Sequence, residues 1–325
     1  MMQQTNNKVE QGNKAHKDMP GNPSTATSSK QKLNDRSNGK PLRVLSEEDW
    51  EFWLENGYII IKNAVPLEQA KTTADFLWEF DEKSPTDSST WYAPPRAEMQ
   101  MKELTGTGMV EVYNHQHLWN NRQTQRVYDA FVDVWGTEKL WVTIDRANLN
   151  FPLPAGVEKK GFIHWDYDPE TKPQNVQGVL ALADQDDENM GGFQCIPWLY
   201  RNYDSWKLTQ PEDRDHFQPS LDGLEDKIVK VKMKAGDLLI FNSTEPHGIR
   251  PNKSKDKVRI AQYISMMPAD PENEEMRNWR VNSWKNKIAP EGYAFPGDPR
   301  KWEQTKYDTA KLSPLGEKLL GLKAW

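Results

Sequence analysis

Seven short segments with the composition of β-strands follow one another from residue 139 onward. Each is rich in apolar or β-branched residues and is bounded by turn-forming residues. Segments this short cannot bury an apolar face alone, so they have to pair and pack in layers. We therefore expect an all-β core over residues 139–149, 162–167, 176–184, 192–197, 228–233, 237–242 and 257–266.

The residues before this block carry helical signals. Ser46 can cap a helix with Asp49 at the capping-box position, and Gly57 is suited to end it. The β-branched run at 58–61 predicts one more strand, and Pro66 can open a second helix. A third helix is expected near residues 121–135. The sequence thus predicts helices flanking the strands.

Composition divides the chain into three parts. Residues 1–41 contain no aromatic residue and are dominated by Asn, Gln, Ser, Lys, Gly and Pro. Such a segment buries too little apolar surface to offset its ordering entropy, so we expect a disordered polar tail. Residues 42–270 are expected to form the folded domain, and the Trp-rich residues 271–325 a C-terminal extension packed on it.

Charge, cysteine content and hydropathy exclude several classes of protein. The net charge of −6 argues against a broad basic surface for nucleic acid. The single cysteine, Cys195, cannot form an intramolecular disulfide, which favours a reducing compartment, and we expect a cytoplasmic protein. Apolar runs fall far short of the roughly 20 residues that span a bilayer. We therefore expect no nucleic-acid or membrane partner, and a monomer as the default.

Two His-x-Asp pairs are present, and only one has a scaffold that can hold a metal. His16 and Asp18 lie in the polar tail, where nothing fixes their geometry. His164 and Asp166 lie at the start of an expected strand, where alternation sends both side chains to one face. We therefore interpret His164 and Asp166 as two converging ligands.

His247 is the candidate third ligand. It follows a Gly-Asp turn and the apolar run 238–241, so it is expected in a loop or at a strand start. Two imidazoles and one carboxylate on one side of a metal leave the opposite positions open, as in non-haem Fe(II) oxygenases. The spacing therefore predicts an iron site at His164, Asp166 and His247.

Two arginines compete for the role of a carboxylate clamp. Arg259 is the one guanidinium in the otherwise apolar strand 258–264, where leaving it unpaired would be costly. Arg250 lies three residues past His247. The strand argument favours Arg259, and Arg250 remains the alternative, with a possible role in substrate binding.

These motifs together resemble the phytanoyl-CoA dioxygenase-like (PhyH) family of Fe(II)/2-oxoglutarate-dependent oxygenases. The similarity runs from about residue 50 to 268, through the opening 52–58, the His-x-Asp pair, the segment 191–197, and the Gly-Asp…His-Gly…Arg block. The resemblance implies a double-stranded β-helix (jelly-roll, cupin-like) core. It also implies Fe(II) as the metal, 2-oxoglutarate and O2 as cosubstrates, Arg259 pairing with 2-oxoglutarate, and ascorbate as an activator.

Further polar and aromatic residues are candidates for the cosubstrate and substrate pockets. Gln194 and Asn148 are candidates for 2-oxoglutarate, with Arg146 on the same strand face as Asn148. The alternative is that Arg146 and Asn148 face solvent on an edge strand. Candidate substrate contacts are Arg146, Trp165, Trp198, Arg250 and His117, although tryptophans are more often core residues and His117 can simply be hydrogen-bonded.

Asp166 narrows the reaction that the resemblance implies. In halogenating relatives a small residue replaces this carboxylate, so its presence favours hydroxylation, or a desaturation or cyclisation begun by the same hydrogen abstraction. A small-molecule substrate of secondary metabolism is the favoured interpretation. The alternatives are an acyl-CoA hydroxylase of the phytanoyl-CoA type, a protein-modifying oxygenase, and a non-catalytic jelly-roll binding protein.

Overall fold

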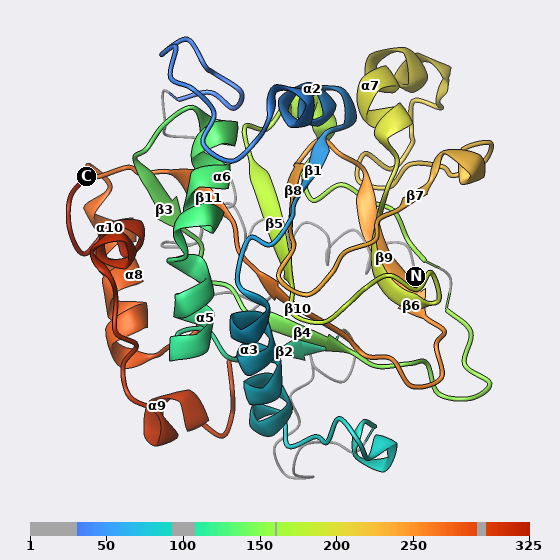
Figure 1. Ribbon diagram of the computed structural model, residues 1–325. Coiled ribbons are helices and arrows are strands. Elements are labelled where there is room, and N and C mark those ends of the chain that lie inside the picture. Colours follow the sequence, from blue (N-terminus) through green and yellow to red (C-terminus); the bar gives the residue numbers. More distant parts are fainter. Residues whose placement is uncertain (1–30, 93–107, 160, 291–296) are drawn as a thin grey trace.

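The computed structural model describes residues 31–92, 108–159, 161–290 and 297–325, and two antiparallel sheets form its core (Figure 1). The larger sheet has six strands, in the spatial order β1 (Tyr58–Ile61), β8 (Leu238–Asn242), β5 (Val176–Ala181), β10 (Arg259–Tyr263), β4 (Ala147–Asn150) and β2 (Met109–Val110). The smaller sheet has three, in the order β7 (Val229–Lys230), β6 (Met190–Cys195) and β9 (His247–Asn252).

Both faces of the larger sheet are buried. Along β8, Leu238 and Ile240 belong to the core under the helices, whereas Leu239 and Phe241 pack with Phe193 of the smaller sheet. A strand covered on both faces needs a continuous apolar run rather than alternation, as β8 has. Two sheets packed face to face are the jelly-roll architecture, and the expected all-β core with flanking helices is confirmed.

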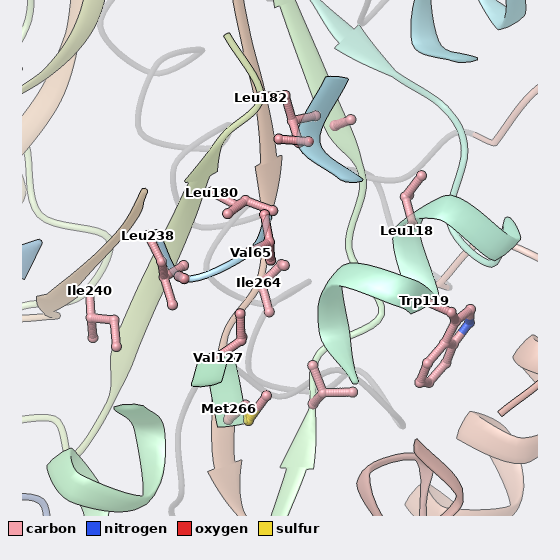
Figure 2. Packing of buried hydrophobic residues seen from close by; sticks show 14 of the residues in the cluster. Val65, Leu118, Trp119, Val127, Leu180, Leu182, Leu238, Ile240, Ile264 and Met266 are labelled. Carbon is pink, nitrogen blue, oxygen red and sulfur yellow. The ribbon is translucent and has the colours of Figure 1, made fainter. Parts of the chain in front are cut away.

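Helices cover the outer face of the larger sheet. They are α2 (Glu47–Asn56), α3 (Leu67–Phe80), α5 (Gln116–Arg122) and α6 (Gln125–Trp135). The predicted cap of α2 is present, since the Ser46 hydroxyl accepts from the Asp49 backbone and the Asp49 carboxylate accepts from the Ser46 backbone. Figure 2 shows Val127 of α6 with Leu180 of β5, Leu238 of β8 and Ile264, the residue after β10, in one apolar cluster.

The third predicted helix is wrong in one respect, because residues 121–135 do not form a single helix. α5 ends at Arg122 and α6 begins at Gln125, with Thr124 in an extended conformation between them. Thr124 Oγ1 donates to the Asn120 carbonyl and accepts from the Gln69 side chain of α3. These local and tertiary contacts interrupt the helix although the apolar period continues through it.

Several predicted strands are shorter than expected. Segment 139–149 divides into β3 (Leu140–Val142) and β4, and segment 257–266 into β10 and β11 (Met266–Pro268), which pairs with β3. Segment 162–167 is an irregular extended stretch whose backbone pairs with the smaller sheet at the bridge between His164 and His247. Short 3-10 turns lie at Ser88–Thr90, Pro169–Thr171, Lys207–Thr209 and Glu225–Lys227.

The predicted boundary of the polar tail at residue 41 is too late. Asn34 donates its backbone N–H to the Val134 carbonyl, and its side chain accepts from the Trp53 indole N–H. Leu33 packs against the main core. Residues 31–41 thus lie on the domain, while residues 1–30 of that prediction lie outside the described residues.

The C-terminal extension packs on the helical side of the domain. It contains α8 (Glu274–Asn286), α9 (Trp302–Lys306) and α10 (Pro314–Leu320), and α8 and α10 lie next to β3 and the α5–α6 pair (Figure 1). The Trp325 indole donates to the Leu140 carbonyl, and its ring stacks on Tyr128 of α6. α7 (Pro197–Trp206) lies instead beside α2. Within the described ranges, no helix is long and apolar enough to cross a bilayer.

Candidate metal and cosubstrate site

The backbone brings His164 and His247 side by side. His247 is the first residue of β9, and His164 lies in the extended stretch between β4 and β5. The two residues exchange backbone hydrogen bonds, with N···O distances of 2.8 and 3.0 Å. Alternation along the stretch then places Asp166 on the same side as His164, while Trp165 points away into a separate apolar cluster.

The three side chains converge on one point. His164 Nε2 lies 3.2 Å from Asp166 Oδ1, and His247 Nε2 lies 3.5 Å from Asp166 Oδ2. Ligand atoms of all three residues lie within 4.8 Å of one another. Two imidazoles and one carboxylate at this spacing fit a divalent transition metal, and this donor set is typical of non-haem Fe(II) sites.

A hydrogen bond to the backbone orients the His247 ring. Its Nδ1 lies 2.9 Å from the Glu245 carbonyl oxygen, which can only accept, so Nδ1 donates there and Nε2 is the ring nitrogen that faces Asp166. The rings of Phe241 and Phe193 pack against this imidazole, with centroid separations of 4.4 and 5.8 Å. The His247 ring is thereby held with Nε2 toward Asp166 and His164.

Asp166 is held in its charged form. Burial disfavours the carboxylate, but hydrogen bonds to His164 and His247, and their charges, outweigh burial and hold the pKa of Asp166 well below its usual range. Its Oδ2 also accepts a hydrogen bond from the side-chain amide of Gln177, on β5. A metal ligand has to be deprotonated, so Asp166 needs no proton loss near neutral pH to serve as one.

Arg259 lies at the start of β10 with its guanidinium buried. Its Nη1 donates to Asn148 Oδ1 across 2.9 Å, and its Nε lies 3.3 Å from Gln185 Oε1. Its Nη2 is buried and finds no hydrogen-bond partner within the described part of the chain. A buried guanidinium with an unused donor fits a carboxylate that is not part of the chain.

Arg250, the alternative clamp, is bound to the backbone instead. It donates to the carbonyls of Phe193 at 2.6 Å and Gly191 at 2.7 Å, with a longer contact of 3.4 Å to that of Val231. Burial, with the nearby charge of Arg259, lowers the pKa of Arg250 to about 10. The guanidinium thus links β9 to β6 and to Val231, the residue after β7, which distinguishes it from Arg259.

Arg146 is neither exposed nor free. Its guanidinium forms a buried ion pair with Glu111, whose other oxygen accepts from the Tyr113 hydroxyl and from the Gly297 backbone N–H. The alternative, that Arg146 and Asn148 face solvent on an edge strand, is wrong, because both are buried and β2 covers the edge of β4. Sequence reasoning missed Glu111, which lies 35 residues from Arg146.

Four other predicted site residues have contacts away from the triad. Gln194 donates to the Phe162 carbonyl at 3.4 Å, against the loop before His164. Trp165 and Trp198 pack in the apolar cluster beneath α7. His117 lies on α5 beside Phe76 and His115, and His115 caps that helix.

The structure adds Gln177 to the site. The sequence signal for it is weak but present: Gln177, Val179 and Ala181 alternate along β5, so an amide stands on a strand face that is otherwise apolar. A second group of Asp168, Glu170 and His216 also lies within ligand distance. Arg214 pairs with Glu170 there, so this group forms an ion-pair network at the surface.

Comparison with known proteins gives one family match and related chains. A family model described as Phytanoyl-CoA dioxygenase (PhyH) matches residues 53–261. "Ava biosynthesis cluster protein O" from Aspergillus versicolor is 29% identical over 247 residues, covering 68% of this chain and 77% of that protein. A Dictyostelium discoideum protein with phytanoyl-CoA dioxygenase in its name is 22% identical over 285 residues, covering 74% and 80%.

Among solved structures, the chain is similar to GlcNAc Inducible Gene 2, GIG2 (DUF1479), from Candida albicans. The TM-score is 0.63 at 14% sequence identity, and the match covers 98% of this chain and 84% of that one. At this identity the likeness shows a shared fold, and it extends over nearly the whole chain.

Proposed function

The chain belongs to the phytanoyl-CoA dioxygenase (PhyH) family and is an iron- and 2-oxoglutarate-dependent dioxygenase, and on this premise we propose that it oxidises an unactivated C–H bond of a small molecule. The observation that carries the proposal is the convergence of His164, Asp166 and His247, whose ligand atoms lie within 4.8 Å of one another. The three residues hold the iron in this proposal. Arg259, positioned by Asn148, binds the distal carboxylate of 2-oxoglutarate.

Bound iron would activate O2, the oxidant, with 2-oxoglutarate decarboxylated to succinate and CO2 in the same reaction. The chain contributes binding and orientation. The Glu245 carbonyl and the two phenylalanine rings fix the His247 imidazole, and the charged Asp166 completes the ligand set. The apolar side chains between the two sheets keep water from the inner end of the site.

We propose a substrate from secondary metabolism. The relative from Aspergillus versicolor carries "biosynthesis cluster protein" in its name, which supports a tailoring step on a small metabolite. Asp166 is consistent with hydroxylation, or with desaturation or cyclisation. The competing substrate is an acyl-CoA of the phytanoyl-CoA type, which the name of the Dictyostelium relative favours.

The test measures succinate formed from 2-oxoglutarate with Fe(II), ascorbate and O2, with a pooled metabolite extract or phytanoyl-CoA added. We expect turnover that rises with the extract and is lost in His164→Ala. His216→Ala is the matched control, because His216 lies in the surface network rather than in the triad, and its turnover should match the wild type. A wild-type protein that bound neither Fe(II) nor 2-oxoglutarate anaerobically would contradict the proposal, and a response to phytanoyl-CoA alone would select the acyl-CoA alternative.

A further inference from the structure

Gln177 touches the proposed iron ligand Asp166 directly. Its side-chain amide donates to Asp166 Oδ2, and the other carboxylate oxygen, Oδ1, faces His164 at 3.2 Å. A carboxylate can only accept, so the amide nitrogen, not its oxygen, faces Asp166. We propose that Gln177 is a positioning residue, which keeps Asp166 a ligand through one oxygen and so leaves the adjacent metal position open for 2-oxoglutarate or O2. The inference rests on the proposed function.

The backbone position of Gln177 is fixed from both sides. On β5, Gln177 is paired with Phe241 of β8, whose ring packs on the His247 imidazole. The next residue, Gly178, donates its backbone N–H to the Ser265 hydroxyl and accepts from the Ile264 N–H. A Cβ at Gly178 would lie 2.1 Å from the Ile264 carbonyl oxygen, so β5 approaches that segment as only glycine allows. The amide is therefore presented by a rigid strand.

The surroundings of Gln177 argue that the amide serves Asp166. The residues that follow it on the same strand face, Val179 and Ala181, belong to the apolar cluster between the sheets. The half-buried Gln177 stands at the edge of this cluster, and Asp166 supplies a hydrogen-bond partner for its amide. Because the amide is neutral, it adds no charge to the two imidazoles and one carboxylate of the site.

The consequence for the metal follows from carboxylate chemistry. An aspartate can bind a metal through one oxygen or through both, and in the second mode it takes up two coordination positions. A hydrogen bond that engages Oδ2 reduces its availability to the metal. Partners that orient a ligand in this way typically contribute 10–100-fold to metal affinity.

The experiment uses Co(II) as an air-stable probe of the metal site. The full chain is titrated with Co(II), and then with 2-oxoglutarate, while the d–d absorption bands are recorded. In Gln177→Met, which keeps the side-chain length but lacks the donor, we expect roughly 10–100-fold weaker Co(II) binding. We also expect weaker d–d bands, because a second Asp166 oxygen raises the coordination number, and weaker binding of 2-oxoglutarate. Gln177→Leu, a second variant that also lacks the donor, should lose a similar amount of affinity.

Gln262→Met is the matched control. Gln262 is a fully buried glutamine on the neighbouring strand β10, and its amide donates to the Leu118 carbonyl of α5, away from the triad. We expect this variant to lower the melting temperature while its Co(II) affinity and spectrum stay within about twofold of the wild type, an allowance that corresponds to less than about 0.5 kcal/mol.

The outcomes separate this inference from the proposed function. Wild-type affinity and spectrum in both Gln177 variants would overturn the positioning role and leave the proposed iron site intact. A wild-type protein that does not bind Co(II) would overturn the iron site and this inference with it. Equal losses in the Gln177 and Gln262 variants would show that Gln177 acts through general stability, which also overturns the inference.

Discussion

Arg259 donates from Nη1 to Asn148 Oδ1 across 2.9 Å, while its buried Nη2 finds no hydrogen-bond partner elsewhere in the described ranges. The two residues come from adjacent strands, β10 and β4, and lie on the face toward the smaller sheet. Asn148 therefore orients the guanidinium without neutralising it, and one donor stays available for an anion.

Arg259→Gln should raise the KM for 2-oxoglutarate by roughly 10–100-fold, since charged hydrogen bonds contribute about 1.5–3 kcal/mol. Its Co(II) affinity should stay near that of the wild type. Arg250→Gln should instead lower the melting temperature, because two carbonyls of β6 and that of Val231 lose the guanidinium donor. Steady-state kinetics with calorimetry would check both, and the reverse pattern would assign the clamp to Arg250.

Gly57 is expected to tolerate no side chain. It ends α2 in the left-handed conformation with φ +70°, and a Cβ there would lie 2.7 Å from Glu245 Oε2 and 2.8 Å from the Tyr200 ring. Gly57→Ala should reduce the free energy of unfolding by about 2–4 kcal/mol, the sum of backbone strain and the clash. Gly156→Ala isolates the strain, because φ is +80° there and a Cβ would meet nothing within 4 Å. If urea denaturation showed the same loss of unfolding free energy in Gly57→Ala and Gly156→Ala, the clash would be ruled out.

The elements that sequence predicts well are those whose local pattern agrees with their tertiary setting. The capping box at Ser46 and Asp49 is formed as expected, and the apolar run of β8 fits a strand buried on both faces. The same is true of the convergence of His164 and Asp166. Alternation across His164 and Asp166 depends only on extended backbone, which the stretch retains although it is not a regular strand.

What sequence could not predict depends on partners distant along the chain. Gln69 of α3 contacts Thr124 across 55 residues and contributes to the break between α5 and α6. Arg146 pairs with Glu111, which no spacing rule links to it. The spacing of apolar residues and the composition of a segment indicate which face of a helix or strand is buried. They do not indicate which buried polar groups meet on that face.

Arg280 is expected to hold the C-terminal extension on the domain. This fully buried side chain of α8 donates to the carbonyls of Leu319 and Leu320, at the end of α10, and to that of Val142 on β3. A cation at the C-terminus of a helix satisfies carbonyls that have no partner within the helix. Arg280→Met should lower the free energy of unfolding by about 3–5 kcal/mol, because several buried carbonyls lose their donor.

Arg277→Met is the control for Arg280, since Arg277 lies on the same helix with a half-exposed side chain and a 3.8 Å contact to Glu274. It should change the free energy of unfolding by less than about 1 kcal/mol. Limited proteolysis should cleave the extension of Arg280→Met first. Protection equal to the wild type would contradict the docking role.

Asp81 makes stability depend on pH. It follows α3 as its C-terminal cap, is fully buried, and neither carboxylate oxygen has a hydrogen-bond partner among the residues described. Burial raises the pKa of Asp81 to about 7, although the charges of Lys83 and Arg300 act in the opposite direction. Because the folded state binds this proton more tightly than the unfolded state, folding is favoured most at low pH. That contribution is lost as the pH rises from about 4, where the unfolded chain ionises, to about 7.

Asp81→Asn removes the ionisation while keeping the shape of the side chain. It should therefore raise the free energy of unfolding at pH 8 relative to the wild type, by on the order of a few kcal/mol, and change it little at pH 4. Urea denaturation at the two pH values gives the difference directly. Gly156→Ala alters no titratable group, so it should change the free energy of unfolding by the same amount at pH 4 and at pH 8. If Asp81→Asn also shifted stability equally at pH 4 and pH 8, the carboxylate would have to be charged in the folded protein across that range, and the buried acid would need a cation that neutralises it.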